Sequence, residues 1–240
     1  MNAAWLIARR EWRSQLTSPL GFLLIASALL IDGLLLYWQG LSRALLSSEV
    51  IEQFFFWASG TTMIAGVVLS ARSFAEERQA GTLVLLTTAP VSDVALVAGK
   101  FLSSFGLLAL MTVCTAYLPL LVLVAGKVSI GHLLVGYLGL LLLGASSVSI
   151  GLLASSLART QVLAAILAAL LHAVLLLLWA LAAATQPPLS EVLTVAALHH
   201  QHQRAFAQGV LRLDAVVYYV ALCWVLLLAT TKILEARRWK

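Results

Sequence analysis

The segment ARSFAEERQAGTLVLLTTAPVSDVALVAGK, residues 71–100, is a charged stretch that separates two long apolar runs. Its ionisable side chains, Glu76, Glu77 and Arg78 among them, are too costly to leave in hydrocarbon. The segment therefore lies in water at one face of a membrane. The order of its residues predicts a short helix, a break at Gly81, a second helical or extended piece and then Pro90. The segment is thus a shaped surface rather than a loose tether, which is typical of a docking site.

The composition indicates an integral membrane protein built from helices. Hydrophobic residues make up 62% of the 240 residues, charged residues 10%, and the mean hydropathy is +1.00. Soluble domains contain about 45–50% apolar and about 25% charged residues. Only helices and closed barrels span a bilayer, and the apolar runs lack the alternation of barrel strands. We therefore expect an all-α membrane protein with one transmembrane domain over residues 1–240.

Six apolar runs are long enough to cross the hydrocarbon core, which requires about 17–25 helical residues. The predicted spans are Leu20–Trp38, Phe54–Ala71, Phe101–Ala125, Gly131–Ser155, Val162–Thr185 and Ala215–Thr231. An even number of spans places both termini on one side of the membrane.

The basic residues decide which side that is. The side of the termini holds Arg9, Arg10, Arg13, Arg72, Arg78, Lys100, Arg159, Lys232, Arg237, Arg238 and Lys240. The other side holds Arg43, Lys127, Arg204 and Arg212. Because the more basic side faces the cytoplasm, we expect both termini there. This bias accounts for most of the net charge of +5, so no nucleic-acid partner is expected.

The start of the chain predicts an amphipathic helix in the membrane interface. Residues 2–16 combine three arginines with Trp5, Trp12 and Leu16, which roughly share one face of a helix. Two interpretations stay open: a helix that only anchors the topology, and a connecting helix that touches a cytoplasmic partner. The first apolar run is as long as a full span and lacks a small-residue cleavage site after it, so we expect an uncleaved anchor.

The sequence contains no recognisable catalytic motif. It has no GxxxxGK[ST] phosphate-binding loop, no HExxH metal motif and no glycine-rich dinucleotide fingerprint. A chain that performs work across a membrane would then draw its energy from another protein. A partner ATPase is the simplest source, and the charged segment is the surface at which it would press.

The charged segment also carries a family resemblance. The string RSFAEERQAGTLVLL at residues 72–86, P-x-S at 90–92 and GKF at 99–101 resemble the cytoplasmic loop of type-2 ABC exporter permeases. The similarity is to the permeases of gliding motility and of nitrous oxide reductase maturation. The residues around the last span, GVLRLD at 209–214 and LEARRW at 234–239, agree with it. The resemblance covers essentially the whole chain.

The resemblance implies a coupling surface on residues 72–100. In these permeases, the loop after the second span carries a coupling helix, which sits in a cleft of a separate ATPase subunit beside the N-terminal connecting helix. Two such ATPase subunits bind ATP and Mg²⁺, whereas the permease is no enzyme and binds no cofactor or metal itself. By position, the coupling residues are Phe74, Glu76, Glu77, Arg78, Gly81 and Thr82. The charged side chains suit charge-assisted hydrogen bonds, and the aromatic ring suits an interface anchor. A solvated loop that only holds the topology is the alternative.

The resemblance further implies a dimer, formed with a second copy or a paralogue, whose pathway is made largely by the second and fifth spans. Small residues at four-residue spacing let helices pack closely in lipid. Such stripes are Thr62, Gly66 and Ser70 on the second span and Ala164, Ala168 and His172 on the fifth. Packing within one subunit explains the same stripes.

Two ionisable residues, Asp32 and His172, lie inside predicted spans, where charge is costly and often functional. For His172 we consider a role at the pathway or dimer interface, with a hydrogen bond to a neighbouring helix as the alternative. For Asp32 we expect a structural hydrogen bond, with a proton or substrate site as the alternative. Cys114 and Cys223 also fall in spans and are expected to be inert apolar residues.

Residues 187–214 are the one sizeable external segment, and they resemble the short external or re-entrant helices before the last span in these permeases. His199, His200 and His202 lie here. Their spacing defines no closed metal site, and no cysteine or carboxylate flanks them closely. We expect a polar interfacial helix rather than a metal centre.

Together these patterns predict a six-span permease subunit of an ABC exporter in the bacterial inner membrane. Its partners would be membrane lipid, the ATPase, a second permease and a possible periplasmic or membrane accessory protein. Two alternatives stay open. One is a mechanotransmission complex of the same architecture that moves no solute. The other is a helical scaffold or small channel unrelated to ABC proteins.

Overall fold

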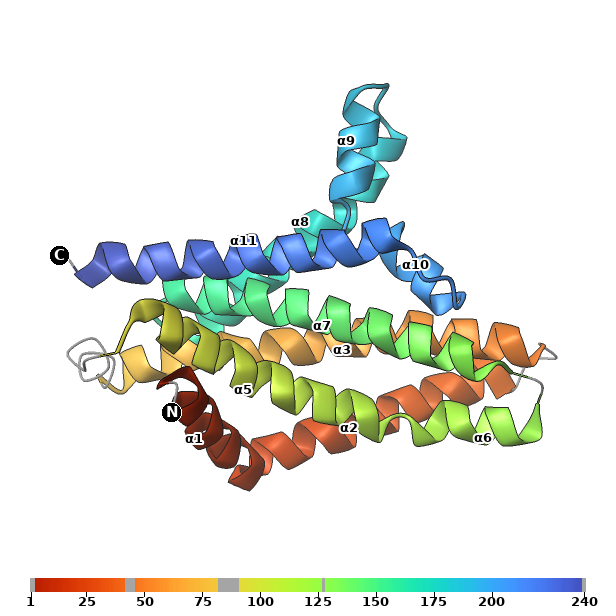
Figure 1. Ribbon diagram of the computed structural model, residues 1–240, viewed down its shortest axis with the longest axis horizontal. Helices are drawn as coiled ribbons and strands as arrows, with labels where there is room; N and C mark the ends of the chain where they lie inside the picture. The colour runs from red at the N-terminus through yellow and green to blue at the C-terminus, as the bar shows by residue number, and fades with distance from the viewer. Residues whose placement is uncertain (1–2, 42–45, 82–90, 127, 239–240) are drawn as a thin grey trace.

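The computed structural model describes residues 3–41, 46–81, 91–126 and 128–238, and the regular elements within these ranges are all helices (Figure 1). In chain order they are α1 (Ala3–Thr17), α2 (Pro19–Leu35), a π-helical turn η1 (Leu36–Leu41), α3 (Ser47–Gln79), α5 (Asp93–Cys114), α6 (Tyr117–Ala125), α7 (Ile130–Leu157), α8 (Gln161–Ala183), α9 (Leu189–Ala196), α10 (His202–Ala207) and α11 (Leu213–Arg238).

Six helical stretches have the length and hydropathy to cross a membrane, which confirms the predicted all-α architecture with six spans. They are Gly21–Gly40, Ser47–Gln79, Asp93–Val124, Ile130–Leu157, Gln161–Ala183 and Leu213–Ala236. The second differs most from its prediction, because α3 continues past Ala71 to Gln79. The short helix expected before Gly81 is therefore present, as a continuation of the span and not as a separate element.

The long helices run side by side along the longest axis of the molecule, and both chain ends lie at the same end of it (Figure 1). We call this the terminal end. The helix α1 crosses it at an angle and packs on α5. The helices α3 and α7 are the most buried of the spans, whereas α2, α8 and α11 are peripheral. The architecture is thus a central helix pair surrounded by the other spans.

Small residues explain the close packing of α3 on α7. A Cβ atom added to Gly66 of α3 would lie 2.7 Å from the Cβ of Ser147. One added to Gly151 of α7 would collide with the hydroxyl oxygen of Ser70. Thr62 is buried in the same seam. The small-residue stripe of the second span is therefore an internal contact, because small side chains let two helix backbones approach closely in lipid.

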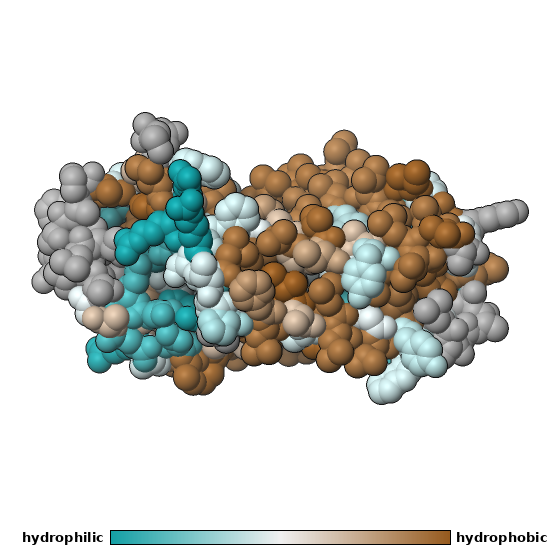
Figure 2. Space-filling model, turned by 90° about the horizontal axis from the view of Figure 1, so that it is seen from below, coloured by the Kyte–Doolittle hydropathy of each residue, from teal (hydrophilic) through white to brown (hydrophobic). Residues whose placement is uncertain are grey.

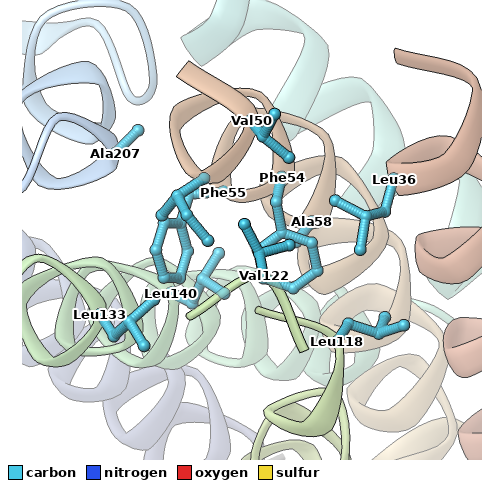
Figure 3. Close-up of a cluster of buried hydrophobic side chains, with 11 residues drawn as sticks. Leu36, Val50, Phe54, Phe55, Ala58, Leu118, Val122, Leu133, Leu140 and Ala207 are labelled. Atoms are coloured by element: carbon cyan, nitrogen blue, oxygen red, sulfur yellow. The ribbon is translucent and has the colours of Figure 1, made fainter. Parts of the chain in front are cut away.

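Far from the terminal end, aromatic and aliphatic side chains close the core. Phe55 of α3 lies across Gly136 of α7, which leaves no room for a side chain there. Figure 3 shows this apolar cluster between η1, α3, α6, α7 and α10. It includes Leu36, Val50, Phe54, Phe55, Ala58, Leu118, Val122, Leu133, Leu140 and Ala207.

The segment 187–214 contains two short helices. α9 packs against α8, and α9 projects from the bundle together with the adjoining end of α8, whose remaining length packs on α7 and α3 (Figure 1). α10 packs on α7 and α3. The alternating polarity of this segment thus corresponds to two short helices that differ in burial, since α9 has no buried residue whereas four of the six residues of α10 are buried.

Candidate functional site

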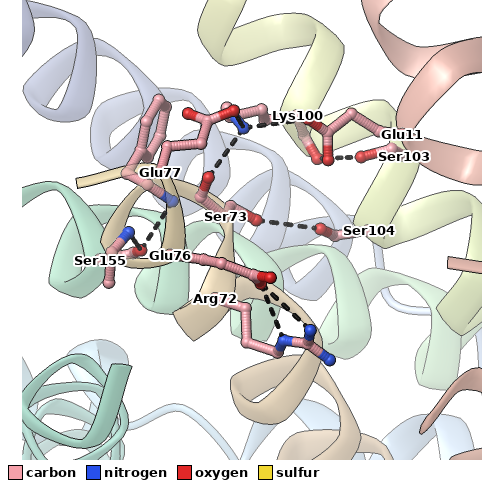
Figure 4. Close-up of polar contacts among 11 residues, drawn as sticks. Glu11, Arg72, Ser73, Glu76, Glu77, Lys100, Ser103, Ser104 and Ser155 are labelled. Carbon is pink, nitrogen blue, oxygen red and sulfur yellow. Dashed lines mark hydrogen bonds and ion pairs between the residues drawn. The ribbon is translucent and has the colours of Figure 1, made fainter. Parts of the chain in front are cut away.

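A buried lysine joins three helices at the terminal end. Lys100 lies two turns into α5, and its side chain is only 1% exposed. Its Nζ donates to Oε1 of Glu77 on α3 at 2.7 Å, to Oε1 of Glu11 on α1 at 3.2 Å and to the carbonyl oxygen of Ser73 at 2.7 Å. We call these four residues the Lys100 cluster. Figure 4 shows them converging from the three helices.

The local sequence of α5 positions this lysine. Ser92 caps the helix, since its hydroxyl oxygen accepts a hydrogen bond from the N–H of Ala95 at 3.3 Å. Gly99 then allows α1 to approach α5 closely. A Cβ at Gly99 would lie 2.8 Å from the Cβ of Ile7 and 2.9 Å from the carbonyl oxygen of Ala4. The cap fixes where α5 begins, and the glycine brings α1 within reach of the ammonium.

The electrostatics of the cluster depend on complete pairing. A buried ammonium is costly unless it is paired and hydrogen-bonded, and here its three N–H donors meet three acceptors. The side chains of Glu77 and Glu11 are 19% and 29% exposed, so both carboxylates retain contact with the outside. The ring centroid of Phe74 lies 5.2 Å from Nζ, within cation–π range. The cluster therefore ties α1 to α3 and α5.

Phe74 does not occupy the predicted surface position. Its side chain is completely buried, in an apolar cluster with Val97 of α5 and Leu152 of α7. Because α3 stays helical here, its period of 3.6 residues turns Phe74 toward the bundle while Glu76 faces out. The ring is part of the core and is not an exposed anchor for a partner.

Arg78 is also turned inward. Its guanidinium donates to the carbonyl oxygens of Ser156, at 3.0 Å, and of Ala158, where α7 ends. The last carbonyl groups of a helix have no partner within that helix. Arg78 therefore caps α7 and fastens the end of α3 to it.

Glu76, by contrast, remains exposed and pairs with Arg72 one turn earlier, with Nη2 and Oε2 3.1 Å apart. Gly81 is exposed and has a φ of +70°, a left-handed conformation that favours glycine after a helix end. The predicted break at Gly81 is confirmed. Thr82 lies outside the described residues.

The stripe on α8 is internal as well. Ala168 and His172 are buried. Nδ1 of His172 lies 3.0 Å from the carbonyl oxygen of Ala168, and Nε2 lies 3.1 Å from the hydroxyl of Ser147 on α7. In the structure both stripes make packing contacts within one subunit, and the role at a dimer interface or pathway stays a prediction. The residues concerned are Thr62, Gly66, Ser70, Ala168 and His172.

Asp32 makes the structural hydrogen bond expected of it. It is buried on α2, and its Oδ1 accepts a hydrogen bond from the hydroxyl of Thr61 on α3 at 2.8 Å. A buried carboxyl group needs such a partner because it has left water.

The three histidines of the segment 187–214 have separate partners. Nε2 of His199 lies 2.7 Å from the hydroxyl of Ser59, the ring of His200 stacks on Trp179, and His202 meets a backbone carbonyl of α9. Burial, reinforced by the neighbouring His200, lowers the pKa of His199 to about 4, so its ring is neutral at neutral pH. Within the described ranges no three His, Cys, Asp or Glu side chains come together as a metal site.

Sequence reasoning missed Glu11 and the hydrogen bonds of Ser155. Glu11 is the single acidic residue among the first 18, where the basic pattern drew attention instead, and that isolation was the available signal. Ser155 of α7 accepts the backbone N–H groups of Phe74 and Ala75, each at 3.0 Å, and donates to the carbonyl of Ala71 at 2.8 Å. Its four-residue spacing from Gly151 and Ser147 predicts close helix packing, but no pattern predicts these hydrogen bonds.

Sequence comparison adds to this geometry. A family model described as "ABC-2 family transporter protein" matches residues 14–224, from α1 into α11. The chain belongs to the ABC-2 transporter family. This ABC-2 protein is therefore a type-2 ABC permease, a multi-pass membrane subunit of a class that typically lacks an ATPase site and works with an ABC ATPase. No curated protein matches its sequence.

Proposed function

We propose that this permease is the transmembrane subunit of an ABC exporter in the bacterial inner membrane, and that an ATPase docks at its terminal end. ATP and Mg²⁺ bind to the ATPase, of which two copies serve a pair of permeases. The terminal end is cytoplasmic in this proposal, because the basic residues of the chain concentrate there.

The observation that carries the proposal is the way in which the end of α3 is fastened. Gln79, the last residue of α3, and Gly81 after it are exposed. Just before them, Arg78 holds the end of α7, and Glu77 holds Lys100. A push on the α3–α5 connection would therefore act on α1, α3, α5 and α7 together. Such a rigid-body response suits alternating access.

The same fastening changes the role expected of the predicted coupling residues. Glu76 and Gly81 offer an exposed surface to the ATPase, whereas Phe74, Glu77 and Arg78 would pass its movement into the bundle. Thr82 is proposed as a surface residue from its sequence position alone.

The proposed pair of permeases meets through the outer face of α8. This helix is the least buried of the six spans. One stripe faces α7 and α3, while Ile166, Leu170 and Leu177 are exposed on the other side. An apolar helix face in a bilayer is satisfied by lipid as well as by protein, so the second copy or paralogue is tested by cross-linking cysteines placed on this face.

Co-purification of the tagged permease from its native membrane in mild detergent tests the main proposal. We expect an ATPase at 1:1 stoichiometry. The variant with Glu76→Lys and Gln79→Lys should lose it, because both exposed side chains change charge at the proposed surface. Glu191→Lys, on exposed α9 at a distance from the terminal end, is the control. A permease that purifies alone, or loses the ATPase equally in both variants, would contradict the proposal.

One observation favours a second function, that of a mechanotransmission complex which moves no solute. The projecting α9 carries the exposed apolar residues Val192 and Val195. Such a projection suits contact with an accessory protein. ATPase activity that depends on this permease, without movement of any solute across reconstituted vesicles, would support this function over export.

A further inference from the structure

A cavity of about 530 Å³ opens at the terminal end between α1, α2, α3 and α5. This volume lies in the range of small-ligand sites. Its polar wall includes Arg10 and Ser14 of α1 and Arg72 of α3, and its apolar wall includes Leu24 of α2 and Val68 of α3. One cavity thus combines charged groups with hydrocarbon, which is the chemistry of a site for an amphiphile.

The position of the cavity corresponds to the boundary between headgroups and acyl chains. Arg72 and Val68 are four residues apart on α3, so the wall changes from charged to apolar over about 6 Å. Val68 is 36% exposed on the surface of a span. Trp5 and Trp12 are exposed on neighbouring α1, and tryptophan concentrates at membrane interfaces. Figure 2 shows hydrophilic side chains gathered at one end of this face, beside the apolar surface.

The charges that line the cavity cancel. They are Arg10, Arg72 and Lys100 against Glu11, Glu76 and Glu77. Lys100 is bonded to its two carboxylates, and Arg72 is paired with Glu76. Arg10 is exposed and acts electrostatically on Glu77, but no hydrogen bond or salt bridge joins these two side chains. The wall as a whole is neutral and gives no advantage to a net anion, whereas a zwitterion can place its phosphate at exposed Arg10 and its ammonium at the half-exposed carboxylate of Glu76.

We propose that this cavity binds the headgroup of phosphatidylethanolamine from the adjacent leaflet. The phosphate lies between the guanidinium groups of Arg10 and Arg72, which suit bidentate phosphate contacts. The primary ammonium donates hydrogen bonds to the carboxylates of Glu76 and Glu11 at the mouth. One acyl chain follows the apolar wall at Val68. A quaternary choline headgroup has no N–H donor for the carboxylates, so phosphatidylcholine fits less well. The proposal holds whether or not an ATPase drives the permease.

Native mass spectrometry of the purified permease tests this assignment. The protein is exchanged into detergent that contains equal amounts of phosphatidylethanolamine, phosphatidylglycerol and phosphatidylcholine, and the retained lipids are counted. We expect phosphatidylethanolamine to be retained preferentially. Arg10→Gln should lower its retention about tenfold, the effect of losing one charge-assisted hydrogen bond. Arg13→Gln makes the same change on α1 at an exposed residue outside the cavity wall and should have no effect.

A second variant tests the cavity independently of charge. Ser14→Phe narrows the cavity from α1, where the serine is exposed, and should also lower retention. Equal retention of the three lipids, or equal losses for the two arginine variants, would overturn the proposal. So would preferential binding of phosphatidylglycerol. Displacement of the lipid by soluble glycerophosphoethanolamine at matched concentration would assign the site to a soluble phosphate ester and reject the membrane lipid.

Discussion

Replacement of Lys100 by methionine should destabilise the permease by about 2–3 kcal/mol. Breaking a buried ion pair by removing one partner costs about 3–5 kcal/mol, because a buried charge is left without compensation. Here the carboxylates that remain are 19% and 29% exposed, so water offsets part of the loss. Polar contacts in membrane proteins are also weak, averaging about 0.6 kcal/mol with a maximum near 1.7. Because of these two effects, the expected cost of Lys100→Met lies below the range for an ion pair that is fully shielded from water.

A double-mutant cycle separates the ion pair from other effects of the substitution. Glu77→Gln alone should cost about 1 kcal/mol, because Lys100 keeps Glu11 and the carbonyl of Ser73. In the variant with both changes, neither the cation nor the facing carboxylate remains. We therefore expect it to be more stable than the sum of the single losses predicts, by about 1–2 kcal/mol, a coupling typical of residues in contact.

Unfolding in mixed micelles of dodecyl maltoside and sodium dodecyl sulfate provides the measurement. The seven tryptophans of the chain give a fluorescence signal for it. The free energy of unfolding is compared for the native protein, the two single variants and the double variant. Single losses that add to within about 0.5 kcal/mol would mean no coupling and would refute the described pairing.

Three further outcomes follow from the packing and the pKa of one histidine. Gly66→Leu should cost about 1–3 kcal/mol of unfolding free energy by overpacking α3 against α7. Gly60→Leu should be tolerated, since a Cβ there meets nothing within 4 Å. Equal losses in the two variants would contradict the close packing of α3 on α7 at Gly66. Thr61→Val removes the hydrogen bond to Asp32 and should cost about 0.6–1.7 kcal/mol in the same assay; no loss would mean that the bond is absent in the membrane. Because the pKa of His199 is about 4 when folded and 6.5 when unfolded, its contribution to stability is complete above pH 6.5 and is lost as the pH falls toward 4. The protection factors of the segment from α9 to α10, which correct the measured hydrogen exchange for its intrinsic pH dependence, should therefore fall between pH 7 and 5, and His199→Gln should remove this dependence. Unchanged dependence in the variant would exclude the histidine as its cause.

The six spans could be predicted because each apolar run must satisfy its own backbone hydrogen bonds in lipid. The end of α3 could not be placed in the same way. The charged residues end the predicted span at Ala71 and make the short helix expected before Gly81 a separate piece, but glutamate, arginine and glutamine are good helix formers, and one helix continues through them. The charged residues determine where the chain leaves the hydrocarbon, whereas Gly81 determines where the helix ends. The two boundaries are separate physical properties and differ here by two turns.

The candidate site was predictable as a region but not as a set of contacts. The sequence indicates that Phe74 and Arg78 lie near the membrane surface, yet which face of α3 turns inward depends on where α7 ends. Likewise, the small residues Gly66 and Ser70 indicate close packing but do not identify the partner helix. Ion pairs between distant segments, such as Glu11 with Lys100, depend on the tertiary fold and leave no periodic pattern.

The length of α3 has a mechanical consequence. Its 33 residues make a rod of about 50 Å, whereas the hydrocarbon core is about 30 Å thick. No proline interrupts Ser47–Gln79. A stiff rod transmits axial displacement without a joint, so a shift imposed on one aqueous side arrives on the other with nearly its full amplitude. The permease could thus carry a stroke across the bilayer through a single helix, with no conformational relay between its ends.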